Sequence, residues 1–175
     1  MYLSNLAVVL SLAAASIAAP ATSFAPYKRA DVLTFRKYND FQISDGVAGN
    51  ALAEVNAAFP VDMSDPAAVS TNDLNILIAA RQTAENAEAA FNTAIGPTAS
   101  GTDEAALEVG KIKNKVLKLR TFEMLVTVQM AQGATDKAAQ LADIQAKLKT
   151  NVGIDSASAG DASQSVSFTD DVQPQ

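Results

Sequence analysis

The sequence of 175 residues contains no cysteine, no histidine and no tryptophan. Without cysteine there is no disulfide framework and no thiol nucleophile, and without histidine as well there is no ordinary zinc site and no Ser-His-Asp triad. Positive charge is also scarce, because 13 Lys and Arg face 19 Asp and Glu, for a net charge of −6. Nucleic-acid binding needs a basic face to meet phosphates. We therefore predict a protein that is not an enzyme, with no catalytic residues, no metal, no cofactor and no nucleic-acid partner.

The first 21 residues are predicted to be a signal peptide. An uncharged run of apolar and small residues covers 6–19 and has the length of a signal-peptide core, shorter than the roughly 20 residues that span a bilayer. Small residues at 19–21, ending at Ala21, suit signal peptidase, and 16–18 form a second candidate site. The alternative is an N-terminal membrane anchor, which the short run disfavours. We expect a secreted, extracellular protein with no transmembrane anchor.

A dibasic pair, Lys28-Arg29, follows the predicted signal peptide within a stretch rich in Pro, Ala and Ser. Its position resembles that of a cleavage site for a fungal kexin-type protease. Residues 22–29 are therefore interpreted as a short propeptide, and the mature chain would begin at Ala30. The alternative is a pair of solvated charges at the start of the chain.

The middle of the chain, residues 30–152, is predicted to be one helical domain. Apolar residues recur there at steps of three and four, the spacing of a helix with one buried face. The predicted helices cover 45–59 with Ser44 as N-cap, 66–95 with Asp65 as cap, 102–132 with Thr102 or Asp103 as cap, and 135–150 with Thr135 as cap. Gly46 and Gly49 in the first of them indicate close approach to a neighbour or a later start. The fold class is all-α, an up-and-down bundle of about four helices.

The two ends of this domain are predicted to differ from the bundle. Residues 30–43 form an N-terminal arm, a short helix or extended segment whose aromatic side chains pack over the helices. Residues 153–175 are rich in Ser, Ala and Asp and have few large apolar side chains, so they cannot offset the entropy of ordering. We predict a mostly flexible tail, in which Val166 and Phe168 are the residues that can dock on the domain.

The helix predicted over 102–132 has two special features. It is apolar on two nearly opposite sides, which predicts a central position in the bundle. It also carries five basic residues within ten positions, of which Lys111, Lys115 and Lys118 share one face and Lys113 and Arg120 lie roughly opposite. The first three form a candidate strip for an anionic partner. The alternative, favoured by the split over two faces, is a solvated helix with the i,i+3 pairs Glu108–Lys111 and Arg120–Glu123.

Three segments carry a family resemblance: 38–55 (YNDFQISDGVAGNALAEV), 110–119 (GKIKNKVLKL) and 159–168 (AGDASQSVSF). Together they resemble cysteine-free small secreted proteins of filamentous ascomycete fungi, which are often described as effector-like. The resemblance covers nearly the whole mature chain. It implies an extracellular fungal protein that acts at a host or substrate surface, and it implies no activity and no functional residues.

Two functions remain open at this point. The first is an interaction protein whose helical surface binds an extracellular, host or cell-wall component. The second is a module that binds a hydrophobic ligand, lipid or surface, in the manner of fungal hydrophobic-surface-binding and cell-wall mannoprotein bundles, a likeness of architecture alone. An apolar cavity between the helices would favour the second, and a filled core with an exposed patch would favour the first. A hydrolase based on Asp and Glu alone is disfavoured, because such sites usually line clefts with aromatic residues and this chain has no tryptophan.

Overall fold

The computed structural model describes residues 27–96 and 101–175, which form a helical bundle with one small sheet. The predicted signal peptide and Ala21 lie outside the described residues. In chain order the elements are α1 (Tyr38–Phe41), β1 (Gly46–Val47), α2 (Ala51–Ala58), the 3-10 turn η1 (Pro66–Ala68), α3 (Thr71–Ala94), α4 (Thr102–Ala131), α5 (Ala138–Ala157) and β2 (Ala162–Ser163).

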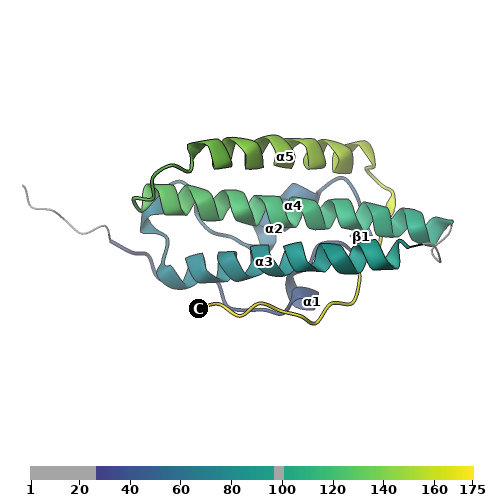
Figure 1. Ribbon diagram of the computed structural model, residues 1–175, viewed down its shortest axis with the longest axis horizontal. Helices are drawn as coiled ribbons and strands as arrows, with labels where there is room; N and C mark the ends of the chain where they lie inside the picture. Colours follow the sequence, from purple (N-terminus) through teal and green to yellow (C-terminus); the bar gives the residue numbers. More distant parts are fainter. Residues whose placement is uncertain (1–26, 97–100) are drawn as a thin grey trace, which may run out of the picture.

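The long helices α3, α4 and α5 lie side by side, with α4 in the middle (Figure 1). Helix α2 packs against α4, while α1 and the C-terminal segment run along the side of α3 away from α5. The predicted all-α bundle and the central position of α4 are therefore confirmed. Helix α4 buries side chains on several sides, including Leu117, Met124 and Val128. It is the element around which the other helices are arranged.

The structure corrects the predicted start of two helices. Helix α2 begins at Ala51 because Gly46 and Val47 are used in β1, so Ser44 is no N-cap; its carbonyl instead accepts a hydrogen bond of 2.5 Å from the Ser163 hydroxyl. Residues 66–68 form only a 3-10 turn. Helix α3 then begins at Thr71, where the Ser70 hydroxyl accepts from the Asp73 amide at 3.0 Å, the bond expected of an N-cap.

Helix α5 also differs from its prediction, at both ends. It begins at Ala138 rather than after Thr135, whose hydroxyl contacts Asp136 in a loop where Asp136 has a positive φ of 61°. It continues to Ala157, seven residues beyond the predicted end at 150. The first five residues of the predicted tail, 153–157, therefore belong to the bundle.

The rest of that tail is docked along the bundle, so the prediction of a mostly flexible segment is corrected. Strand β2 pairs antiparallel with β1, and the Val172 amide donates to the Thr83 hydroxyl at 2.9 Å. The Asp171 carboxylate accepts from the Tyr38 amide at 2.6 Å, and the Phe168 ring meets the Tyr38 ring edge-on with centroids 5.5 Å apart. Hydrogen bonds to the backbone and side chains of the tail hold it in place. The prediction of a flexible tail was based on its few large apolar residues, and this criterion does not detect hydrogen bonds. The expected docking of Phe168 is confirmed.

Tyr38 ties the N-terminal arm to the core. Its side chain is fully buried, its hydroxyl donates to the Asn114 side-chain oxygen at 2.9 Å, and Asn114 donates in turn to the Ala84 carbonyl at 2.8 Å. Burial raises the pKa of Tyr38 from 10.0 to about 12, because the phenolate is poorly solvated there. This one phenol therefore links the arm, α4 and α3, and it must stay protonated.

The raised pKa of Tyr38 predicts a loss of stability in alkali. The folded state holds the phenol proton more tightly than the unfolded chain does. The contribution of Tyr38 to the free energy of unfolding is therefore complete below pH 10 and falls by about 1.4 kcal/mol per pH unit until pH 12. The measurement is the free energy of unfolding by urea between pH 9 and pH 12 for the wild type and Tyr38→Phe. The free energy of unfolding of the wild type, relative to that of Tyr38→Phe, should fall by about 3 kcal/mol as the pH rises from 10 to 12. Parallel curves would contradict the prediction.

Candidate interaction surface

The basic strip predicted on α4 is largely neutralised within the chain. Lys111 pairs with Glu108 at 3.6 Å, and Lys118 pairs with Glu88 of α3 at 2.8 Å. Lys115 is half-buried and has no ion pair with any residue in 27–96 or 101–175. Two of the three lysines thus already have carboxylate partners, which leaves one unpaired charge for an anionic partner. The strip remains a prediction, with reduced charge.

The remaining basic residues of α4 lie elsewhere. Arg120 pairs with Glu123 at 2.7 Å and donates to the Asn56 side chain of α2 at 2.9 Å, so both predicted i,i+3 ion pairs are present. Lys113 is fully buried. The opposite face of α4 is therefore a packing face, in keeping with its central position.

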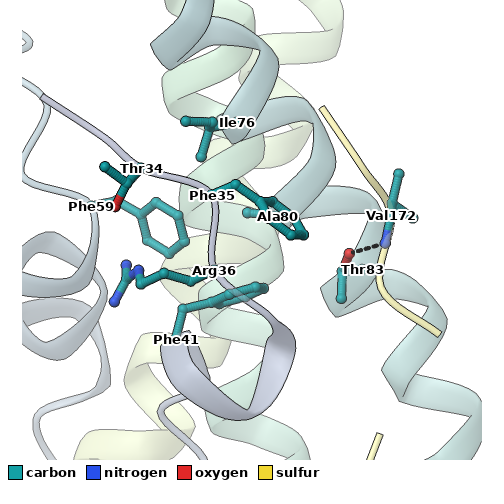
Figure 2. Close-up of a pocket in the computed structure, with 9 residues that line it drawn as sticks. All are labelled: Thr34, Phe35, Arg36, Phe41, Phe59, Ile76, Ala80, Thr83 and Val172. Carbon is teal, nitrogen blue, oxygen red and sulfur yellow. Dashed lines mark hydrogen bonds between the residues drawn. The ribbon is translucent and has the colours of Figure 1, made fainter. Parts of the chain in front are cut away.

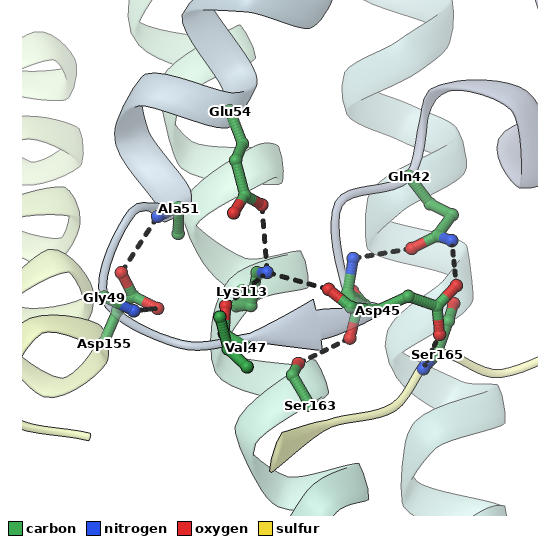
Figure 3. Close-up of polar contacts among 11 residues, drawn as sticks. Gln42, Asp45, Val47, Gly49, Ala51, Glu54, Lys113, Asp155, Ser163 and Ser165 are labelled. Carbon is green, nitrogen blue, oxygen red and sulfur yellow. Dashed lines mark hydrogen bonds and ion pairs between the residues drawn. The ribbon is translucent and has the colours of Figure 1, made fainter. Parts of the chain in front are cut away.

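Lys113 lies at the centre of a polar cluster that joins α4 to β1 and α2 (Figure 3). Its ammonium donates to the carbonyls of Asp45 and Val47, both at 3.0 Å, and pairs with Glu54 at 2.9 Å. These three acceptors use all three N–H bonds of an ammonium group. The helical spacing of the sequence places Lys113 roughly opposite Lys111, Lys115 and Lys118, but it does not predict that Lys113 is buried. The two apolar sides of this helix were the feature of the sequence that indicated burial all around it.

A second buried charge in Figure 3 supplies the N-cap of α2 from a distant helix. The Asp155 side chain of α5 accepts from the Gly49 amide at 3.0 Å and from the Ala51 amide at 2.9 Å. The Ala51 amide is among those that a helix start leaves without a partner, and Gly49 directly precedes the N-cap residue Asn50. No residue next to α2 in sequence provides this cap, so only the fold reveals it.

The interior contains one small enclosed pocket among the described residues, between the arm, α2 and α3 (Figure 2). Phe41 and Phe59 meet edge-on in its wall with centroids 5.5 Å apart, and the guanidinium of Arg36 lies 5.5 Å from the Phe59 ring centre. Its volume is about 10 Å³, which is room for about one water molecule. The described core is packed with side chains around this pocket, which is too small for an organic ligand.

A more accessible apolar site is the groove between α4 and α5, of about 180 Å³. Val109 and Ile112 of α4 and Ile154 of α5 supply its apolar lining, and Ile154 is 43% exposed. Other hollows, of about 290 to 490 Å³, are open depressions with mixed polar and apolar walls. The α4/α5 groove is the candidate interaction surface, because the exposed Ile154 and the half-buried Val109 and Ile112 gather there on two packed helices, beside Glu108, Asp155 and Ser158.

The predicted dibasic pair is within the described residues, where Lys28 is exposed and Arg29 is half-buried. Lys28 and Arg29 both contact the loop 62–69 before α3. Of the predicted processing residues, Lys28 and Arg29 thus contact the folded domain, and Ala21 lies outside the described part of the chain.

Other site types have no support in the described part of the chain. It contains no group of three or more acidic side chains placed to hold a metal ion. None of its helices combines the length and the apolar character that crossing a bilayer requires.

Comparisons with known proteins give one family and no individual relative. A family model described as a domain of unknown function (DUF8454) matches residues 33–167. No curated protein and no solved structure matches the chain.

Proposed function

The chain belongs to the DUF8454 family, whose function is unknown, and we propose that it acts as a secreted, effector-like interaction protein without catalytic activity. The observation that carries the proposal is a core packed with side chains, in which the pocket of about 10 Å³ is too small for an organic ligand. Such a protein works through its surface. The lack of histidine and cysteine argues against the common catalytic centres.

The proposed setting is extracellular and fungal. It is supported by the apolar N-terminal run of 6–19 and by the resemblance of 38–55, 110–119 and 159–168 to small secreted proteins of ascomycete fungi. The partner is accordingly a host or cell-wall component. We place its contact at the α4/α5 groove rather than at the lysine strip, because Lys111 and Lys118 already have carboxylate partners.

The alternative function, binding of a hydrophobic ligand, is favoured by the apolar lining of the same groove. Its volume of about 180 Å³ lies below the roughly 300–1,000 Å³ of pockets that enclose a drug-sized ligand. The groove therefore suits one or two apolar side chains of a protein partner better than a lipid. Native mass spectrometry of the protein from culture medium separates the two functions. The bare mass is expected, and a reproducible small apolar adduct would support the alternative.

A matched pair of substitutions tests the contact surface. Ile154→Asp places a charge in the groove, whereas Ile78→Asp changes another exposed isoleucine, on α3. We expect the first to reduce retention of the labelled protein on wall preparations and host extracellular extracts at least tenfold, as for loss of a central interface residue. The second should leave retention unchanged. Equal retention of both variants and the wild type would contradict the placement of the surface.

A further inference from the structure

The side chain of Arg29 is held by a cradle of oxygen atoms on the loop 62–69. One guanidinium nitrogen donates to the Asp62 carbonyl at 2.9 Å and lies 2.8 Å from the Asp62 carboxylate. The other donates to the Asp65 carbonyl at 2.9 Å and lies 3.8 Å from the Asp65 carboxylate. Only 29% of the side chain is exposed. The planar guanidinium group of arginine can donate paired hydrogen bonds in this way, whereas the ammonium group of lysine cannot.

The backbone around this residue is held as well. The Arg29 amide donates to the Ala68 carbonyl at 2.6 Å, and the Lys28 ammonium donates to the Val69 carbonyl at 3.0 Å. Gln132, just beyond α4, also donates to the Val69 carbonyl, at 2.9 Å, which ties the loop to the bundle. Both basic side chains and one intervening amide therefore have partners within the fold.

The other side of the Arg29–Ala30 bond is anchored by α3. The buried Asp73 carboxylate accepts from the Val32 amide at 3.1 Å and from the Leu33 amide at 2.8 Å. The scissile bond predicted from the sequence thus lies in a short segment fixed at both ends. A protease that recognises two basic side chains needs them free and the backbone extended in its own cleft, and this requires local opening of the fold.

We propose that the loop 62–69 is a shield for the dibasic site, so that cleavage after Arg29 in the folded chain requires this loop to open locally. The reaction is hydrolysis by a dibasic-specific protease, in which water breaks the Arg29–Ala30 bond, leaving a carboxylate on Arg29 and an ammonium on Ala30. A chain that folds before it meets the protease retains Lys28 and Arg29 as part of its structure. The inference rests on the proposed secretion and processing.

The test is the rate of cleavage after Arg29 by a kexin-type protease, followed by mass spectrometry on the folded chain with its dibasic pair intact. A peptide of residues 22–35 gives the unshielded rate. We expect the folded wild type to be cut at least 100-fold more slowly than the peptide. The double variant Asp62→Asn/Asp65→Asn should be cut at least tenfold faster than the wild type. The control Asp103→Asn/Glu104→Gln, which changes two exposed acids at the start of α4, should match the wild type.

Two outcomes would overturn the inference: a wild type cut as fast as the peptide, or a double variant cut as slowly as the wild type. Urea unfolding of the double variant shows whether faster cleavage reflects local release, in which case its midpoint stays near that of the wild type. Cleavage accompanied by global unfolding would count against the shield. The assay needs no partner, so its failure is distinguishable from failure of the groove variants that test the proposed function.

Discussion

Replacing Gly110 of α4 with alanine is expected to destabilise the fold by about 2 kcal/mol and to release the C-terminal segment. A Cβ atom at this position would overlap the Gln164 carbonyl oxygen and lie 3.2 Å from that of Ser44. The obstacle is backbone rather than a flexible side chain, so the segment from β2 onward must shift. Overpacking of this kind costs about 1–3 kcal/mol, and the lost contacts of the tail add to it. The higher helix propensity of alanine offsets about 1 kcal/mol.

The measurement is urea unfolding combined with hydrogen exchange of amides in 162–175. Gly153→Ala is the matched control, because Gly153 also lies within a helix but has no atom near the position of an added Cβ. It should stabilise the protein by about 0.5–1 kcal/mol. If Gly110→Ala kept the stability and the tail protection of the wild type, the close approach of the tail to α4 would be refuted.

The second large effect is expected at Lys113, where methionine should lower the free energy of unfolding by about 3 kcal/mol. The substitution keeps a long apolar stem but removes the ammonium, leaving the carbonyls of Asp45 and Val47 without donors and Glu54 without its ion pair. Unpaired buried acceptors each carry a desolvation cost. Glu54 is partly exposed and regains some hydration, which keeps the loss near the lower end of the range for broken buried pairs.

Lys115→Met on the same helix is the control for this prediction. Lys115 is half-buried and unpaired within 27–96 and 101–175, so its loss should change stability by no more than about 0.5 kcal/mol. Glu54→Gln tests the ion pair by itself and should cost less than Lys113→Met, because both carbonyl contacts remain. Thermal and urea unfolding of the three variants measure these differences. Similar losses of stability in Lys113→Met and Lys115→Met would show that the polar cluster around Lys113 does not stabilise the fold.

The sequence predicted long helices well because their apolar periodicity is carried by many residues. The end of α4 before Gly133, which has a positive φ of 104°, agrees with the predicted end at 132. Its start differs slightly, because Thr102 is already helical and Gly101 occupies the N-cap position predicted for Thr102 or Asp103. Short elements were predicted poorly because tertiary contacts decide them. Residues 45–50 follow a helical pattern, yet Gly46 and Val47 pair with β2 and Asp155 fixes where α2 begins.

The interaction surface was less predictable than the fold. The pairing of Lys111 with Glu108 follows from local spacing, but that of Lys118 with Glu88 depends on how α3 lies against α4. The groove lined by Ile154 required α5 to extend past 150, which the scarcity of large apolar residues after Ile154 concealed. Arg29 illustrates the same limit, because a dibasic pair in a small-residue segment gives no indication of a distant acidic loop.

The contacts that complete this fold join residues far apart in the chain, and this sets the order in which it can form. Asp155 caps α2 across 104 and 106 positions, Ser163 bonds Ser44 across 119, and Asp171 bonds Tyr38 across 133. Closing such long loops is slow compared with pairing neighbouring helices. A nascent chain that has emerged only as far as α4 can form the α3–α4 hairpin, but α2 lacks its cap until α5 follows. The fold is therefore completed only after α5 and the segment that follows it have formed, because these later residues fix Tyr38, Ser44 and the start of α2 in place.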